Sequence, residues 1–174
     1  MLGAIAARRR AASASPWASL AFTEANLGLG EYQFTKATST IWEGFANLTA
    51  PGDFRVRIRP LQNNVAVAVG LDDVLGAVVD TGNLAEHCNL RSDGGFSGST
   101  GYTANSTVTY SYAANETFWF ERIGTVGKIY RGGDGTFGTA ALFYTWSTDT
   151  SDTKALKVLI RNQGASVKVL YSPI

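Results

Sequence analysis

Cysteine and histidine are almost absent from this sequence of 174 residues, which has one of each, Cys88 and His87. A single cysteine excludes an intrachain disulfide. One cysteine and one histidine cannot supply the four ligands of a zinc site within the chain. Asp93-Gly94 and residues 132–135 combine aspartate with glycine, which is typical of tight turns, and neither matches the spaced acidic loop of a calcium site. We therefore expect no metal and no cofactor.

The lone histidine also argues against nucleophilic catalysis, because most catalytic triads use a histidine as the base. His87 is followed directly by Cys88, and neighbouring side chains of a strand point to opposite faces of the sheet. The two residues therefore do not form a ready-made catalytic dyad. We interpret them as a histidine in a loop or at a strand edge, beside a buried thiol.

A surplus of charge of either sign is missing as well. The chain has 15 lysines and arginines against 14 aspartates and glutamates, and its net charge is +1, whereas a domain that binds nucleic acid is usually clearly basic. No segment approaches the ~18 apolar residues of a membrane span. In the first ten residues an apolar run precedes the arginines, which reverses the order found in a signal peptide. We therefore expect neither nucleic acid nor a membrane as a partner.

A pair of carboxylates suited to glycoside hydrolysis is not evident either. Such enzymes hold two carboxylates on one face, about 5–10 Å apart. Glu116 and Glu121 are separated by an odd number of residues, so on a strand they face opposite sides. Asp72 and Asp73 are adjacent and diverge for the same reason, and residues 149–152 belong to a polar loop. We therefore expect no enzymatic activity.

Glycine and short alternating segments are what the sequence has in abundance. It contains 19 glycines, 4 prolines and 45% hydrophobic residues, which suits one domain of short strands joined by tight turns. Residues 54–59 alternate between apolar side chains and three arginines, and Asn63-Asn64 joins them to residues 65–69 in what we predict is a hairpin. The other predicted strands are 32–34, 75–79, 107–112, 118–123, 128–131, 142–146, 156–161 and 167–171. This pattern indicates an all-β chain folded as a two-sheet antiparallel jelly-roll sandwich.

The N-terminal segment differs from the rest of the chain. It is rich in alanine and arginine and shows no alternation, so we predict a short helix or arm that becomes ordered on a partner. The consecutive Arg8, Arg9 and Arg10 are the candidate partner-binding residues, for acidic groups of a protein rather than for nucleic acid. We therefore divide the chain into a basic arm and linker, residues 1–40, and the sandwich domain, residues 41–174.

Aromatic side chains provide the candidate ligand-binding residues. Tyr144 and Trp146 are two residues apart on the predicted strand 142–146, so they share a face on which a sugar ring can stack. The alternative is that both belong to the core or to a protein interface. Residues 118–120, with the sequence Phe-Trp-Phe, place large groups on both faces of one strand. That strand is either buried on both sides or covered by a neighbouring subunit.

Residues 107–135, TVTYSYAANETFWFERIGTVGKIYRGGDG, resemble the concanavalin A-like (laminin-G-like) jelly-roll domain. In that family a strand that ends in an arginine or aspartate is followed by a glycine turn, and the next strand runs into a glycine-rich turn. Arg122, Gly124 and residues 132–133 match this layout, and the resemblance extends over residues 42–171. It is greatest for the copies found in virion proteins of tailed bacteriophages.

The resemblance implies a non-enzymatic virion structural protein of a tailed bacteriophage, made in the host cytoplasm and located in the virion. It implies an oligomeric module on the tail or capsid surface that serves assembly or host-surface attachment. Its partners would be other virion proteins, copies of itself and, for attachment, a host-surface glycan. Because a fold does not determine a function, a lectin-like carbohydrate-binding domain is a first alternative and a glycan-cleaving enzyme a second.

Overall fold

The structure, a computed structural model of the chain, describes residues 15–38, 44–49, 52–72, 81, 84–100, 103–105, 111–133, 135–146 and 155–174. Regular structure in these ranges is almost entirely β-strand, apart from short 3-10 turns such as η2 (Phe137–Thr139). No helix among the described residues has the length and apolar character needed to cross a membrane.

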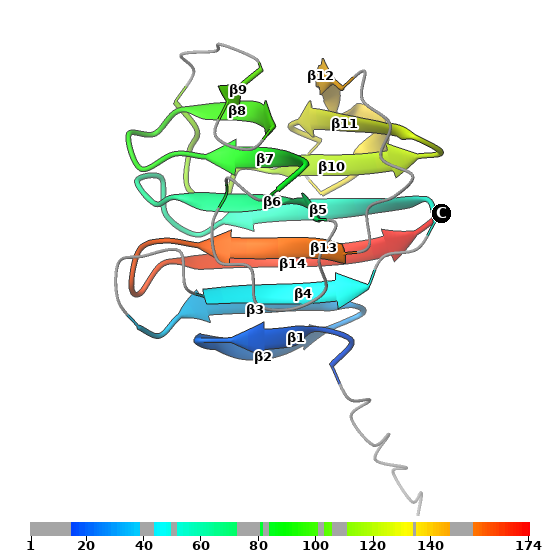
Figure 1. Ribbon diagram of the computed structural model, residues 1–174. Coiled ribbons are helices and arrows are strands. Elements are labelled where there is room, and N and C mark those ends of the chain that lie inside the picture. Colours follow the sequence, from blue (N-terminus) through cyan, green and yellow to red (C-terminus); the bar gives the residue numbers. More distant parts are fainter. Residues whose placement is uncertain are drawn as a thin grey trace, which may run out of the picture.

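Two antiparallel sheets of seven strands each form a sandwich, which confirms the predicted fold class (Figure 1). The first sheet has the order β1 (Ala18–Leu20), β4 (Gly44–Thr49), β13 (Ala155–Ile160), β6 (Val67–Asp72), β7 (Glu86–Leu90), β8 (Phe96–Thr100) and β9 (Thr103–Ala104). The second sheet has the order β12 (Ala141–Thr145), β11 (Val126–Arg131), β10 (Phe118–Ile123), β5 (Phe54–Pro60), β14 (Ser166–Pro173), β3 (Glu31–Lys36) and β2 (Phe22–Gly28).

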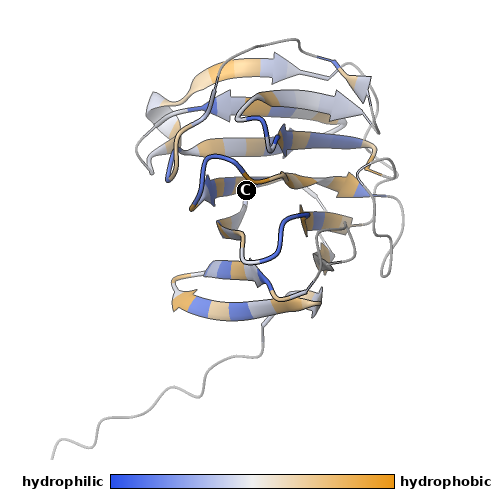
Figure 2. Cartoon of the chain, turned by 90° about the vertical axis from the view of Figure 1, so that its left-hand side faces the viewer, coloured by the Kyte–Doolittle hydropathy of each residue, from blue (hydrophilic) through white to orange (hydrophobic). Residues whose placement is uncertain are grey.

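The core lies between the two sheets, and alternation along each strand decides which side chains enter it. On β5, Phe54, Val56 and Ile58 are fully buried, while the arginines between them point to the outer face. Figure 2 shows the same alternation as hydrophilic and hydrophobic bands along several strands. The two-residue period of a strand therefore sets the inner and outer faces of the sandwich.

The predicted hairpin of residues 54–59 with 65–69 is wrong. β5 lies between β10 and β14 in the second sheet, whereas β6 lies between β13 and β7 in the first. The connection between them therefore crosses from one sheet to the other. The hydroxyl of Tyr112 fixes its far end by donating to the carbonyl of Val65 at 2.5 Å. Alternation predicts the buried face of each strand, but two strands that bury their faces in one core need not be neighbours.

The boundary predicted at residue 41 is too late. β1, β2 and β3 belong to the two sheets, and Phe34 of β3 is fully buried, with its ring 5.2 Å from the ring of Trp17. Residues 31–36 do alternate between buried and partly exposed side chains, but the segment is short. The glycines and threonines around it made the sequence resemble a linker. Residues 1–14, with Arg8, Arg9 and Arg10, lie outside the described residues, as do the predicted strand 75–79 and most of 107–112.

The last two strands occupy interior positions in the sheets. β13 lies between β4 and β6, and β14 lies between β3 and β5 (Figure 1). Each of these strands pairs with segments from the N-terminal half of the chain over five or more residues. The C-terminal 20 residues therefore join the two halves of each sheet.

Candidate functional site

The outer face of the second sheet gathers the charged side chains of several strands. Arg55, Arg57 and Arg59 point outward from β5, Lys128 from β11 and Lys168 from β14, and all five are partly exposed. We call this surface the basic face. Because strands of a sheet are about 4.8 Å apart and alternate residues about 7 Å apart, the five cations share one continuous patch.

Two carboxylates on this face are held by ion pairs. Glu121 of β10 accepts from Arg55 Nε at 2.6 Å and from the Tyr130 hydroxyl at 2.9 Å. Glu31 of β3 accepts from Arg57 Nη2 at 2.7 Å. Burial, together with the hydrogen bond to Glu121, raises the pKa of Tyr130 to about 12. Both carboxylates are therefore occupied by neighbouring side chains.

Arg59 and Lys168 form a different arrangement, because they lie directly opposite each other on neighbouring strands. Arg59 Nε donates to the neutral Thr117 hydroxyl at 2.9 Å, and within the described part of the chain neither cation has an ion-pair partner at 4.0 Å or less. Gln33 of β3 is the next residue across from Lys168. Like charges directly opposite on adjacent strands repel each other, so among the described residues this end of the face carries positive charge without a facing carboxylate.

Phe137 of η2 covers the opposite end of the basic face. Its ring lies 3.8 Å from Arg55 Cζ and makes edge contacts with Trp119 and Tyr130, at centroid distances of 5.4 and 4.8 Å. Trp119 Nε1 donates to the Gly132 carbonyl at 3.1 Å. The alternatives for strand 118–120 are thereby resolved for Trp119, which is covered by the chain's own loop and does not need a neighbouring subunit.

Phe137 follows the glycine-rich segment 132–135, where a turn was expected and where the Thr136 backbone N–H donates to the Gly133 carbonyl. β11 ends at Arg131 and β12 begins at Ala141, so the connection is a longer loop that folds back over the sheet. A Cβ atom at Gly135 would lie 3.3 Å from both Arg57 Nη1 and Arg59 Nη2. Glycine there allows the backbone to approach the two guanidinium groups closely.

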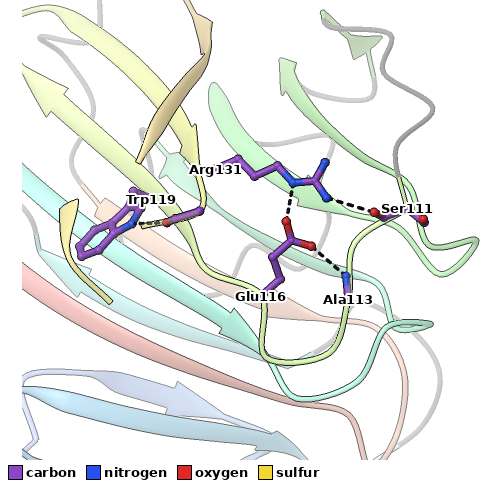
Figure 3. A network of polar contacts seen from close by, with 6 residues as sticks. Ser111, Ala113, Glu116, Trp119 and Arg131 are labelled. Carbon is purple, nitrogen blue, oxygen red and sulfur yellow. Dashed lines mark hydrogen bonds and ion pairs between the residues drawn. The ribbon is translucent and has the colours of Figure 1, made fainter. Parts of the chain in front are cut away.

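A polar network fixes the loop beside this face (Figure 3). Glu116 forms an ion pair with Arg131 and accepts from the Ala113 backbone N–H at 2.9 Å. Arg131 Nη2 also donates to the Ser111 carbonyl at 3.2 Å. Both carboxylate oxygens of Glu116 therefore have partners.

The structure places Tyr144 and Trp146 toward the interior. A Cβ atom at Gly98 of the first sheet would lie 2.9 Å from Tyr144 Cδ1 and 3.3 Å from Trp146 Cζ2, so the two rings share a face, as predicted. That face is the inner one, because Trp146 is 2% exposed and belongs to the core, and Tyr144 is half-buried against it. The pair therefore belongs to the core, which is the alternative that the sequence left open, and does not form an exposed sugar platform.

A β-bulge explains why the alternation misled at this strand. Ile129 pairs with Tyr144, but the next residue, Tyr130, pairs with Leu142. The extra residue, Phe143, packs against Phe96 at a centroid distance of 4.2 Å. A bulge adds one residue to one strand and shifts the faces of its neighbours, so Phe143 and Tyr144 both contact the core.

His87 and Cys88 lie on opposite faces of β7, as expected, and the thiol is buried. The expected loop or strand-edge position of His87 is wrong, because β7 lies between β6 and β8 and the side chain is fully buried. Burial lowers the pKa of His87 to about 3 and raises that of Cys88 to about 12. Among the described residues, no group of three or more histidine, cysteine, aspartate or glutamate side chains could hold a metal ion.

Sequence reasoning missed the basic face as a site, although it predicted that the arginines of 54–59 point outward. Lys128 and Lys168 join them only because β11 and β14 lie close to β5 in the sheet. Sequence order places these strands far apart. The only signal in the sequence was the strict alternation of arginine on one strand.

No protein-family model matches the chain, and no curated protein sequence matches it significantly. Solved structures match its fold. Stonustoxin has a TM-score of 0.59 at 9% identity, over 87% of this chain and 27% of that one. The carbohydrate-binding module CBM66 from Bacillus subtilis has a TM-score of 0.56 at 12% identity, over 90% and 92%. A human SPRY domain has a TM-score of 0.55 at 10% identity, over 88% and 96%. The chain therefore shares a β-sandwich fold of the jelly-roll type with these structures, and at these identities the similarity is one of fold.

Proposed function

We propose that this chain is a non-enzymatic attachment module of a tailed-bacteriophage virion, and that it binds a host-surface glycan through the basic face. The observation that carries this proposal is the face itself. Cations and hydrogen-bonding side chains lie partly exposed on a rigid sheet, where their positions are fixed by strand pairing. Sites on regular strands are held more precisely than sites on loops.

The engagement of the carboxylates supports a role without catalysis. A general acid or nucleophile of a glycosidase needs a carboxylate that can reach the substrate. At least six of the eight described carboxylates contact a cation, a backbone N–H or a hydroxyl: Glu31 contacts Arg57, Asp53 the Gly124 N–H, Asp72 Lys157, Asp93 Arg91, Glu116 Arg131, and Glu121 both Arg55 and Tyr130. These six carboxylates therefore stabilise the fold through ion pairs and hydrogen bonds.

The resemblance of residues 107–135 to phage virion copies of this fold supports the virion setting, and the fold shared with CBM66 supports a carbohydrate ligand. In this setting the protein is located in the virion as a homo-oligomer that contacts other virion proteins. Arg8, Arg9 and Arg10 of the arm bind acidic groups of those partners. The lectin-like alternative differs only in that the module acts outside a particle.

Binding to purified bacterial surface polysaccharides tests the attachment function. The full-length protein should be retained saturably on at least one polysaccharide of a panel and should release no sugar fragments. Absence of binding across the panel would contradict the attachment role. Fragment release that disappears when one Asp or Glu is replaced would show a glycan-cleaving enzyme instead.

The virion setting is tested separately by native mass and particle composition. The protein should form an oligomer in solution and should be found, by peptide mass spectrometry, in particles purified on a density gradient. A monomer that binds glycan but is absent from particles would favour the stand-alone lectin.

A further inference from the structure

We infer that the ligand of the basic face is an acidic polysaccharide, whose carboxylates bind at Arg59 and Lys168. This inference rests on the proposed attachment function and names its ligand class.

Strand register divides the outward charges into three rows across the sheet. In one row, Arg55 and Lys128 flank the single carboxylate of Glu121. In the next, Arg57 reaches over the neighbouring strand to Glu31, so the charges balance. In the third, Arg59 and Lys168 are opposite each other, and no described carboxylate lies in the row. Counted over the described residues, the face therefore carries a positive surplus, and most of it lies in the third row.

The third row has the geometry of an anion site. Arg59 and Lys168 are about 5 Å apart at the backbone, and the Arg59 guanidinium extends toward Thr117 and Gly135, so an acidic polymer that lies across β5 and β14 can contact both cations. A guanidinium group binds a carboxylate with two parallel hydrogen bonds, and an ammonium group adds a third. The repulsion between Arg59 and Lys168 is relieved when a carboxylate lies between them.

Neutral hydrogen-bonding groups surround this cation pair. Gln33 is the cross-strand neighbour of Lys168. One step along the strands, the hydroxyls of Thr35 and Ser166 are 2.7 Å apart. Cations flanked by amide and hydroxyl groups suit a sugar that carries both a carboxylate and hydroxyls.

A nucleic acid fits the face less well. Single strands bind through exposed aromatic rings on which bases stack, but Trp119 is 6% exposed and both it and Tyr130 pack against Phe137. A duplex needs many phosphate contacts for useful affinity, and the chain as a whole carries a net charge of only +1. The shortage of exposed rings and of total charge favours a sparsely charged polymer.

Binding of the full-length protein to polygalacturonate, dextran and a dT oligonucleotide tests the inference. Polygalacturonate should bind, and its affinity should fall as NaCl rises from ~0.05 to ~0.5 M. The double variant R59Q/K168Q should weaken this binding about tenfold or more. Arg91→Gln is the matched control, because Arg91 is an exposed arginine away from the face and paired with Asp93, and it should leave the affinity unchanged.

The double variant loses the hydrogen bond from Arg59 to Thr117, which can destabilise it. Lys168→Gln alone keeps that bond, and the affinity of this single variant for polygalacturonate should fall about threefold. Equal binding of polygalacturonate by wild type and by a folded variant overturns the inference. Binding of dextran but not polygalacturonate also overturns it, while the attachment function stands. Tighter binding of the oligonucleotide than of polygalacturonate overturns it in favour of nucleic acid. Failure of every glycan, including the surface polysaccharides, would remove the proposed function itself.

Discussion

At the scale of single residues, His87 makes the stability of the protein depend on pH. It is fully buried in an interior strand, and burial alone lowers its pKa to about 3. The unfolded chain takes up a proton near pH 6.5, so the native state loses stability as pH falls from about 6.5 toward 3. Well above pH 6.5 the histidine is neutral in both the folded and the unfolded state, so His87 no longer makes stability depend on pH.

We expect the free energy of unfolding to fall by about 3 kcal/mol between pH 7 and pH 4 through His87. Urea unfolding of the wild type and of His87→Gln at the two pH values measures this contribution. The glutamine variant does not titrate, so its stability should change less by about that amount. An identical pH dependence in both proteins would show that His87 is not the group responsible.

Gly70 lies where β6 comes unusually close to β7. A Cβ atom there would overlap the carbonyl oxygen of Glu86 and the Cβ of His87. Because backbone atoms of an interior strand cannot move aside cheaply, Gly70→Ala should destabilise the protein by about 3 kcal/mol. Gly138 is the control, since a Cβ atom there meets nothing within 4 Å, and its alanine variant should stay within about 0.5 kcal/mol of wild type. Chemical unfolding compares the two, and equal stabilities would contradict the expected clash.

At the scale of elements, the loop with Phe137 stabilises the second sheet from outside. Phe137→Ala removes the contact with Arg55 and the edge contacts with Trp119 and Tyr130. We expect a loss of about 1–2 kcal/mol and greater quenching of tryptophan fluorescence by acrylamide as water reaches Trp119. Thr139→Ala, in the same turn and exposed, should change neither quantity. Unchanged quenching in the phenylalanine variant would mean that the loop does not protect Trp119.

The sequence predicted the buried and exposed faces of a strand better than it predicted which strands are neighbours. Alternation predicted the buried and exposed sides of β5 because that period is a property of the strand itself. It did not predict that β5 pairs with β10 and β14, because register and neighbours are set by contacts between distant segments. At β12 a single bulged residue brings both Phe143 and Tyr144 to the core, where strict alternation would place them on opposite faces. The role of Phe137 carried no signal, because one aromatic residue among glycines has no period.

At the scale of the whole molecule, the described sandwich begins at its N-terminal end with Trp17, whose backbone N–H donates to the Ser15 hydroxyl at 3.1 Å. Deleting residues 1–14 keeps this contact. We expect the truncated protein to melt within ~3 °C of the full chain, because the arm is predicted to order only on a partner. We also expect the truncated protein to have the native mass of a monomer. Thermal melts and native mass measurements test both parts. A large drop in melting temperature would instead make the arm part of the sandwich.

The interior positions of β13 and β14 have a consequence for how the protein is made. A ribosome releases the N-terminal strands first, yet β4 and β6, and likewise β3 and β5, cannot be joined until residues 155–174 have emerged. Nascent chains therefore present open strand edges until then, and sheets that depend on such distant pairing fold slowly and are prone to aggregate. Expression at low temperature or with chaperones should raise the yield, and loss of the C-terminal strand through premature termination should leave no folded product.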